Sequence, residues 1–163
     1  MQTAIDQRKK TERGITMIEL VVVMGIFAIL AVSVRFFPID LFYAKSLDDD
    51  ATKIAFALRG AHDRAVAQEG ASAWGVHFVN GPSGGDYYQV FEGDSFAAGV
   101  VAERVNLNET VQFLTPPSSS SSDVLFAKMT GLPSGASSLI ISLVSKPSAT
   151  KTISILSNGQ IQY

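Results

Sequence analysis

Glu19 has the most unusual setting among the ionisable residues of this 163-residue sequence, because residues 15–34 around it are almost entirely apolar. A carboxylate inside a membrane-length apolar stretch costs about 2.5–3.5 kcal/mol on insertion scales, and such residues usually serve a function. If the bond after Gly14 were cut, Ile15 would carry a free α-amine one helical turn from Glu19. An amine and a carboxylate stabilise each other far more in apolar surroundings than in water. The simpler interpretation is that Glu19 lies near the lipid headgroups and reaches water.

The other ionisable and nucleophilic residues form no catalytic constellation, so we expect that the protein is not an enzyme. His62 falls on the polar side of a predicted helix and His77 alternates with apolar residues in a predicted strand, so we interpret both as structural. The acidic run 48–50 could suggest a cation site, but successive helix residues point in different directions, which favours a solvated face. Residues 80–86 lack the lysine of a phosphate-binding loop. The serine-rich run 116–123 has no base at a fixed spacing, and we interpret it as a mobile loop.

Four aromatic residues lie close together in the second half of the chain: Tyr87, Tyr88, Phe91 and Phe96. With basic partners they could stack on nucleic-acid bases, and they could also form an exposed adhesive patch. The nearest charged residues in the sequence are acidic, namely Asp86, Glu92 and Asp94. We therefore expect these aromatic side chains to pack in a strand core, and we expect no nucleic-acid partner. No cofactor and no metal ion is predicted.

The stretch that contains Glu19 has the length of a membrane span. A helix of about twenty residues is about 30 Å long, which matches the hydrocarbon core of a bilayer. Four basic residues precede the stretch: Arg8, Lys9, Lys10 and Arg13. Basic residues next to a span hold that end in the cytoplasm. We therefore expect a single-pass transmembrane helix over residues 15–37, with the rest of the chain outside the cytoplasmic membrane.

The segment from residue 13 to residue 20 resembles the class III signal of type IV pilins and type II secretion pseudopilins. That pattern is a short basic leader ending in glycine, a hydrophobic first mature residue, threonine second and glutamate fifth; Gly14, Ile15, Thr16 and Glu19 stand at these positions. Ile15 replaces the commonest residue, phenylalanine. The resemblance implies that a membrane peptidase removes residues 1–14 and methylates the new amine of Ile15. It also implies that Glu19 pairs with the N-terminus of a neighbouring subunit during filament assembly.

By this resemblance the protein is a structural subunit, a minor pilin or pseudopilin, of a type IV pilus or a type II secretion filament. The implied partners are the prepilin peptidase/methyltransferase, other pilin or pseudopilin subunits, an inner-membrane assembly platform and membrane lipid. The subunit would reside in the cytoplasmic membrane before it joins the filament. Three alternatives stay open: a major pilin, a single-span anchored binding or enzymatic domain, and a secretory signal peptide cut after residues 31–33.

A second, amphipathic helix is expected over residues 38–70. Its apolar positions recur at spacings of three and four, as in one face of a helix: Leu47, Ala51, Ile54, Ala55, Leu58, Ala61 and Ala65. Pro38 is expected to bend the chain where the two helices meet, since proline lacks an amide hydrogen and crowds the preceding turn. Pro38 lies two residues later than the kinking proline of the resembled family. Gly70 is expected to end the helix.

After Gly70 the apolar period changes to two, which predicts strands. The expected strands cover residues 73–79, 87–91, 100–107, 110–114, 124–127, 139–144, 152–156 and 160–163. The tripeptide 157–159, Ser-Asn-Gly, predicts a tight hairpin turn because Asn-Gly accepts positive φ angles. A helix followed by strands makes the fold class α+β, pilin-like, with an antiparallel sheet or a small two-layer β-sandwich as a globular head over residues 71–163.

The last forty residues are similar to the C-terminal half of the GspH/FimT minor pseudopilins. The similarity rests on residues 124–126 with the following Gly131, then on the apolar runs 139–142 and 152–155, and on the final Gly-Gln-Ile at 159–161. The composition agrees with a folded domain, since 47% of the residues are hydrophobic and only 17% are charged. With no cysteine the chain has no disulfide and no thiolate ligand, and its net charge of −2 does not favour nucleic acid.

Overall fold

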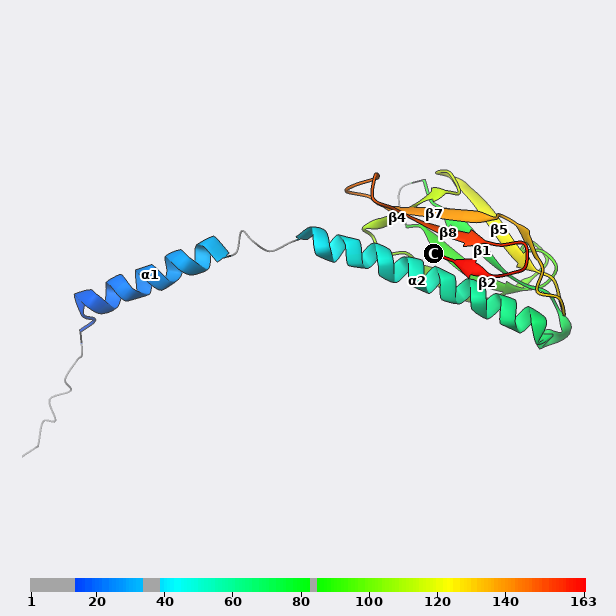
Figure 1. The fold of residues 1–163 in the computed structure, drawn as a ribbon, viewed down its shortest axis with the longest axis horizontal. Helices are drawn as coiled ribbons and strands as arrows, with labels where there is room; N and C mark the ends of the chain where they lie inside the picture. The colour runs from blue at the N-terminus through cyan, green and yellow to red at the C-terminus, as the bar shows by residue number, and fades with distance from the viewer. Residues whose placement is uncertain (1–13, 34–38, 83–84) are drawn as a thin grey trace, which may run out of the picture. The chain divides into compact units, whose positions relative to one another are not determined.

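The computed structural model describes residues 14–33, 39–82 and 85–163. The chain divides into two units, Met1–Pro38 and Ile39–Tyr163. The first contains helix α1 (Met17–Ser33). The second begins with helix α2 (Ile39–Val66) and the short 3₁₀ helix η2 (Glu69–Ala71) (Figure 1); it joins α2 to the expected head of residues 71–163, and from here on we call this whole unit the head. The bend expected at Pro38 lies outside the described residues.

Two antiparallel sheets follow the helices in the head. In chain order the strands are β1 (Trp74–Asn80), β2 (Tyr87–Glu92), β3 (Val100–Asn106), β4 (Val111–Thr115), β5 (Ser120–Phe126), β6 (Pro133–Gly135), β7 (Ser138–Leu143), β8 (Thr150–Ile155) and β9 (Ile161–Gln162). One sheet has the order β3-β2-β1-β5-β6 and the other β4-β7-β8-β9. Helix α2 contacts strands of both sheets and runs along one side of them (Figure 1). The predicted α+β, pilin-like architecture is confirmed.

The apolar stripe predicted on α2 is the part of the helix that enters the core. All seven residues of the stripe are buried, and six of them have no exposed surface. Four of the seven are alanines, whose small side chains let the helix backbone approach both sheets closely. Phe78 of β1 and Phe126 of β5 belong to the same core cluster as the stripe, and both are fully buried.

The serine-rich run 116–123 is not a loop throughout, so the prediction of a mobile loop is wrong for residues 120–123. These residues form the first half of β5 and pair with the end of β1, with Ser120 opposite Asn80 and Ser122 opposite Phe78. The apolar alternation that predicts a strand begins only at Val124, because the first half of β5 is polar. Its strand conformation comes from pairing with β1, which is distant in sequence.

Three local features differ from the sequence prediction. Helix α2 ends at Val66, before Gly70, because the chain reverses through Gln68 in a left-handed conformation with φ 58°. Strand β6 was not predicted, since its three residues carry no apolar alternation and lie at the sheet edge. The hairpin between β8 and β9 centres on residues 157 and 158, where the Gly159 amide donates to the Leu156 carbonyl at 2.8 Å. Gly159 (φ 85°), and not Asn158, is the residue with the positive φ.

Deprotonation of Tyr88 on β2 lowers the stability of the head at alkaline pH. Burial, with smaller contributions from Glu103 and Asp50, raises its pKa from 10.0 to about 12. The folded state therefore holds this proton more tightly than the unfolded state, and the resulting stability is complete below pH 10 and lost between pH 10 and about 12. We expect the free energy of unfolding to fall over this window by at most about 1.4 kcal/mol per pH unit. Denaturant titrations at several pH values should show the fall in the wild type and a shallower one in Tyr88→Phe; equal slopes would contradict the assignment.

Candidate functional site

Thr16 and Glu19 are brought together by the first turn of α1. The Thr16 side-chain oxygen accepts a hydrogen bond from the backbone N–H of Glu19 at 3.3 Å, and the Thr16 carbonyl accepts one from the N–H of Leu20 at 3.2 Å. Thr16 is thus the N-cap of the helix, and Glu19 is its third residue, the spacing of a capping box. Glu19 is the acidic residue in the first turn of α1, where the helix dipole favours a negative charge.

The predicted processing site lies immediately before this cap. Gly14 is exposed, and a Cβ added there would have no atom within 4 Å. Ile15 is 77% exposed. The residues on both sides of the predicted cleavage site are therefore accessible, and the new amine of Ile15 would lie directly next to the Thr16 cap.

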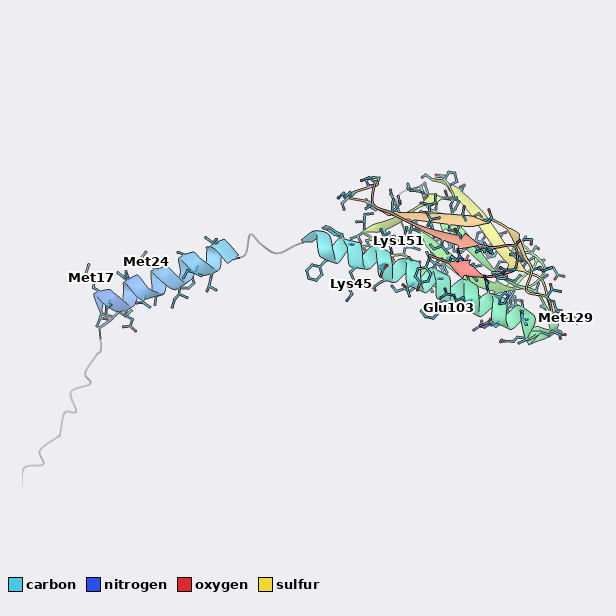
Figure 2. All side chains as sticks on the ribbon, in the orientation of Figure 1. Met17, Met24, Lys45, Glu103, Met129 and Lys151 are labelled. Carbon is cyan, nitrogen blue, oxygen red and sulfur yellow. The ribbon has the colours of Figure 1, made fainter. Side chains whose placement is uncertain are left out.

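Helix α1 presents apolar side chains on all its sides. Thirteen large apolar residues between Ile15 and Val32 are exposed, from 44% for Val23 to 88% for Met17. Figure 2 labels Met17 and Met24 among the side chains that project from this helix. A helix that is apolar all round needs an apolar environment on every side.

Within the described part of the chain, no helix is both long enough and apolar enough to qualify as a membrane span. The single-pass topology stays a prediction.

The two histidines belong to separate packing clusters in the head. His62 on α2 meets the edge of the Phe126 ring at 5.5 Å, and its imidazole fills the space beside Gly131 and Gly159, where a Cβ would come within 2.5 Å and 2.8 Å of it. His77 on β1 stacks on Phe96 with ring centroids 3.7 Å apart and hydrogen-bonds to Asp123.

The His77–Asp123 pair resembles part of a catalytic triad, but its neighbour Ser122 does not complete one. Asp123 lies opposite His77 in the pairing of β1 and β5, whereas Ser122 lies opposite Phe78. Side chains alternate between the two faces of a sheet, so the Ser122 hydroxyl points away from the His77 imidazole. We continue to interpret His77 as structural.

In the acidic run at 48–50, Asp48 and Asp49 are exposed, as a solvated face requires, but the prediction is wrong for Asp50, which is buried. Asp50 is 3% exposed; its carboxylate accepts a hydrogen bond from the Asn108 amide at 2.8 Å and pairs with Lys53 at 2.9 Å. Asp48 instead pairs with Lys151 at 2.7 Å, and its side chain is 58% exposed. Asp50 and Asp48 therefore link α2 to the loop between β3 and β4 and to strand β8. Among the described residues no group of three or more ligands could hold a metal ion.

A pair of buried polar residues joins the two sheets at the end of β1. Asn80 donates from Nδ2 to the carbonyls of Phe113 and Pro116, both at 2.8 Å. The Asp86 carboxylate accepts from the amides of Phe113 at 2.6 Å and Gly81 at 3.0 Å. Asn80 and Asp86 thus provide hydrogen-bond partners for the carbonyl and the amide N–H of Phe113. Phe113 lies on β4, which is an edge strand of the second sheet. The two side chains take the place of a neighbouring strand there and so protect an edge that could otherwise pair with another chain.

The aromatic residues of β2 and the following loop pack against other side chains, as predicted. Their charged neighbours are not all acidic, however, because Arg104 contacts Tyr87. Tyr88 is 4% exposed and Phe91 is fully buried. The Phe96 ring meets Phe91 edge-on at 5.4 Å. The guanidinium of Arg104 on β3 lies 3.7 Å from the centre of the Tyr87 ring. This basic neighbour was missed because it is distant in sequence, and it covers Tyr87 rather than leaving the ring free for a base.

Comparisons with known proteins agree with the N-terminal geometry and add nothing for the head. Residues 9–34 match a family model described as the prokaryotic N-terminal methylation motif. This match covers the last six residues of the leader, the predicted cut after Gly14, the Thr16 cap and Glu19, and it supports a type IV pilin-like prepilin signal. No curated protein and no solved structure matches the chain, so the similarity of the last forty residues to GspH/FimT pseudopilins is not confirmed.

Proposed function

We propose that the protein is a structural subunit, a minor pilin or pseudopilin, of a type IV pilus or a type II secretion-type filament, and that it has no enzymatic activity. The observation that carries the proposal is the register of Gly14, Thr16 and Glu19 at the start of an entirely exposed apolar helix, within the matched methylation motif. In this proposal prepilin peptidase cuts between Gly14 and Ile15 and the amine of Ile15 is methylated. The GspH/FimT subtype is a finer proposal, supported by the pattern of the last forty residues.

The exposed surface of α1 supports assembly through this helix. Its large apolar side chains are exposed, and packing against the same helices of neighbouring subunits would bury them. The Glu19 carboxylate would then be surrounded by apolar helices, where an unpaired charge is costly. Pairing with the Ile15 amine of a neighbour would remove that cost and would fix the axial register between the subunits.

Changing Gly14 tests the processing step. We expect Gly14→Val, in the full chain co-expressed with a prepilin peptidase, to retain residues 1–14, whereas the wild-type chain loses them and gains a methyl group at Ile15. The valine disturbs no contact, because nothing lies within 4 Å of a Cβ at Gly14. Intact-mass spectrometry measures both changes.

Gly25 provides a matched control in the same segment, since a Cβ there also meets nothing within 4 Å. Gly25→Val should be cut and methylated like the wild type. Cleavage of Gly14→Val at the wild-type level would contradict the proposed site. A wild-type chain that keeps its full mass would favour the alternative of a membrane-anchored binding or enzymatic domain, and abundance in sheared filaments would favour a major pilin.

A further inference from the structure

The loop between β5 and β6, residues 127–132, which we call the distal loop, is a hydrogen-bonded turn that exposes Met129 and Leu132. It is closed by hydrogen bonds from the Gly131 amide to the Ala127 carbonyl at 2.8 Å and from the Ala127 amide to the Leu132 carbonyl at 3.0 Å. The Met129 amide donates to the Ala65 carbonyl at 3.0 Å, which fixes the loop to the last turn of α2. Met129 therefore lies at the end of the head where α2 ends (Figure 2).

Met129 combines backbone strain with exposure. Its φ is 68°, a left-handed conformation that costs a residue with a Cβ about 1–2 kcal/mol. The side chain is nonetheless 64% exposed, next to Leu132 at 53% and Val66 at 42%. Strain that is held in place without burying the side chain indicates a role for the exposed surface. A loop that is already ordered also loses little conformational entropy when it binds.

The opposite end of the head contains a cleft of about 650 Å³, which we call the proximal cleft; among the described residues it is lined by β4, by residues 81, 82, 85 and 86 after β1, and by residues 107–109 after β3. Its wall at Asn108 is bonded to Asp50 on α2, whereas the distal loop is bonded to Ala65. Fifteen residues of helix separate these two attachment points, which is about 22 Å at 1.5 Å per residue. The two surfaces therefore do not overlap.

Both surfaces expose apolar side chains. Leu114 and Val144 line the proximal cleft and are 40% and 51% exposed, so the cleft offers apolar surface to the apolar side chains of the distal loop.

Their charges are complementary as well. The ionisable residues among those that line the cleft are acidic, the exposed Glu109 and the buried Asp86. Within the described residues, Asp86 has only backbone amides as partners and no basic side chain. The distal loop carries the exposed Lys128, whose ammonium donates to the Ala71 carbonyl at 2.9 Å and would exchange this bond for a carboxylate on docking. A positive loop and a negative cleft attract each other.

We propose that the distal loop of one copy of this chain docks into the proximal cleft of a second copy, with Met129 on the apolar wall and Lys128 facing Glu109. Because the loop and the cleft lie at opposite ends of the head, each docked copy leaves one free loop and one free cleft. Such a head-to-tail contact propagates into a row rather than closing into a dimer. The inference concerns the head alone and goes beyond the proposed processing and assembly of the N-terminal segment.

Site-directed disulfide cross-linking tests this contact, since the chain contains no cysteine. The full chain, purified in detergent, carries Met129→Cys and Leu114→Cys together. A single loop in a cleft is small beside a standard interface, so the contact is expected to be weak, and cross-linking traps weak contacts. Mild oxidation should yield dimers and a ladder of larger species.

Three controls decide the outcome. Met129→Cys alone and Leu114→Cys alone should give little product, because a head-to-tail contact does not bring identical residues together. Met129→Cys with Val100→Cys uses an exposed position, 70% accessible, outside the cleft. We expect about tenfold less product from this pair than from the loop–cleft pair. Equal yields from the two pairs would overturn the proposal, even if the chain is cut and methylated as proposed.

A charge exchange tests the electrostatic part in the same assay. Lys128→Glu should lower the yield of the loop–cleft pair about fivefold by placing like charges at the contact. Adding Glu109→Lys should restore the yield. Loss without restoration would overturn the pairing of Lys128 with Glu109.

Discussion

Replacing Glu19 by alanine is expected to leave cleavage after Gly14 intact and to lower incorporation into filaments about a hundredfold. Removing the carboxylate leaves the amine of a neighbouring Ile15 unpaired among apolar helices, at a cost of about 2.5–3.5 kcal/mol, and each 1.4 kcal/mol is a factor of ten. The variant and the wild type should be compared by intact mass and by the amount of subunit recovered in the sheared filament fraction.

Two further variants separate charge from packing. Glu19→Gln keeps the shape of the side chain but not its charge, and it should fail like Glu19→Ala. Met24→Ala removes apolar packing surface from the same helix without touching the amine, and it should lower incorporation far less than Glu19→Ala does. Normal incorporation of Glu19→Ala would refute the pairing mechanism.

Phe78→Ala is expected to cause the largest loss of stability in the head, about 3–5 kcal/mol. The ring is fully buried on β1 and meets Phe113 of the other sheet at 5.8 Å and 79°, and Tyr88 at 6.1 Å. Its removal leaves a cavity where the two sheets meet the helix. Denaturant unfolding of the full chain, followed by tryptophan fluorescence, measures the change.

Phe56→Ala is the matched control, because it deletes the same atoms from a side chain of α2 that is 64% exposed. Its effect should stay within about 0.5 kcal/mol, as for most surface substitutions. Similar losses for the two variants would mean that Phe78 does not join the sheets.

The sequence predicted those parts of the fold that depend on local periodicity. The spacing of the stripe from Leu47 to Ala65 is a property of one helix, and all its residues are buried as expected. The Thr16 cap was also readable, since threonine followed three residues later by glutamate is a capping-box pattern, although Thr16 had been singled out only through the resemblance to pilins.

The features that were missed depend on partners far along the chain. Asp50 looked like part of a solvated run because the amide it accepts from, at Asn108, is 58 positions away. Asp86 bonds to Phe113 across 27 positions. The polar half of β5 became a strand only through its pairing with β1. Such contacts follow from tertiary packing and leave no periodic signal in the local sequence.

The account depends most directly on the start of the mature chain. The protein isolated from its native membrane or filament should be analysed by intact mass and N-terminal sequencing. The proposed function predicts a chain that begins at Ile15 with a methylated amine. A mature chain that begins at Val34, as after an ordinary signal peptide, or one that retains residues 1–14, would contradict it.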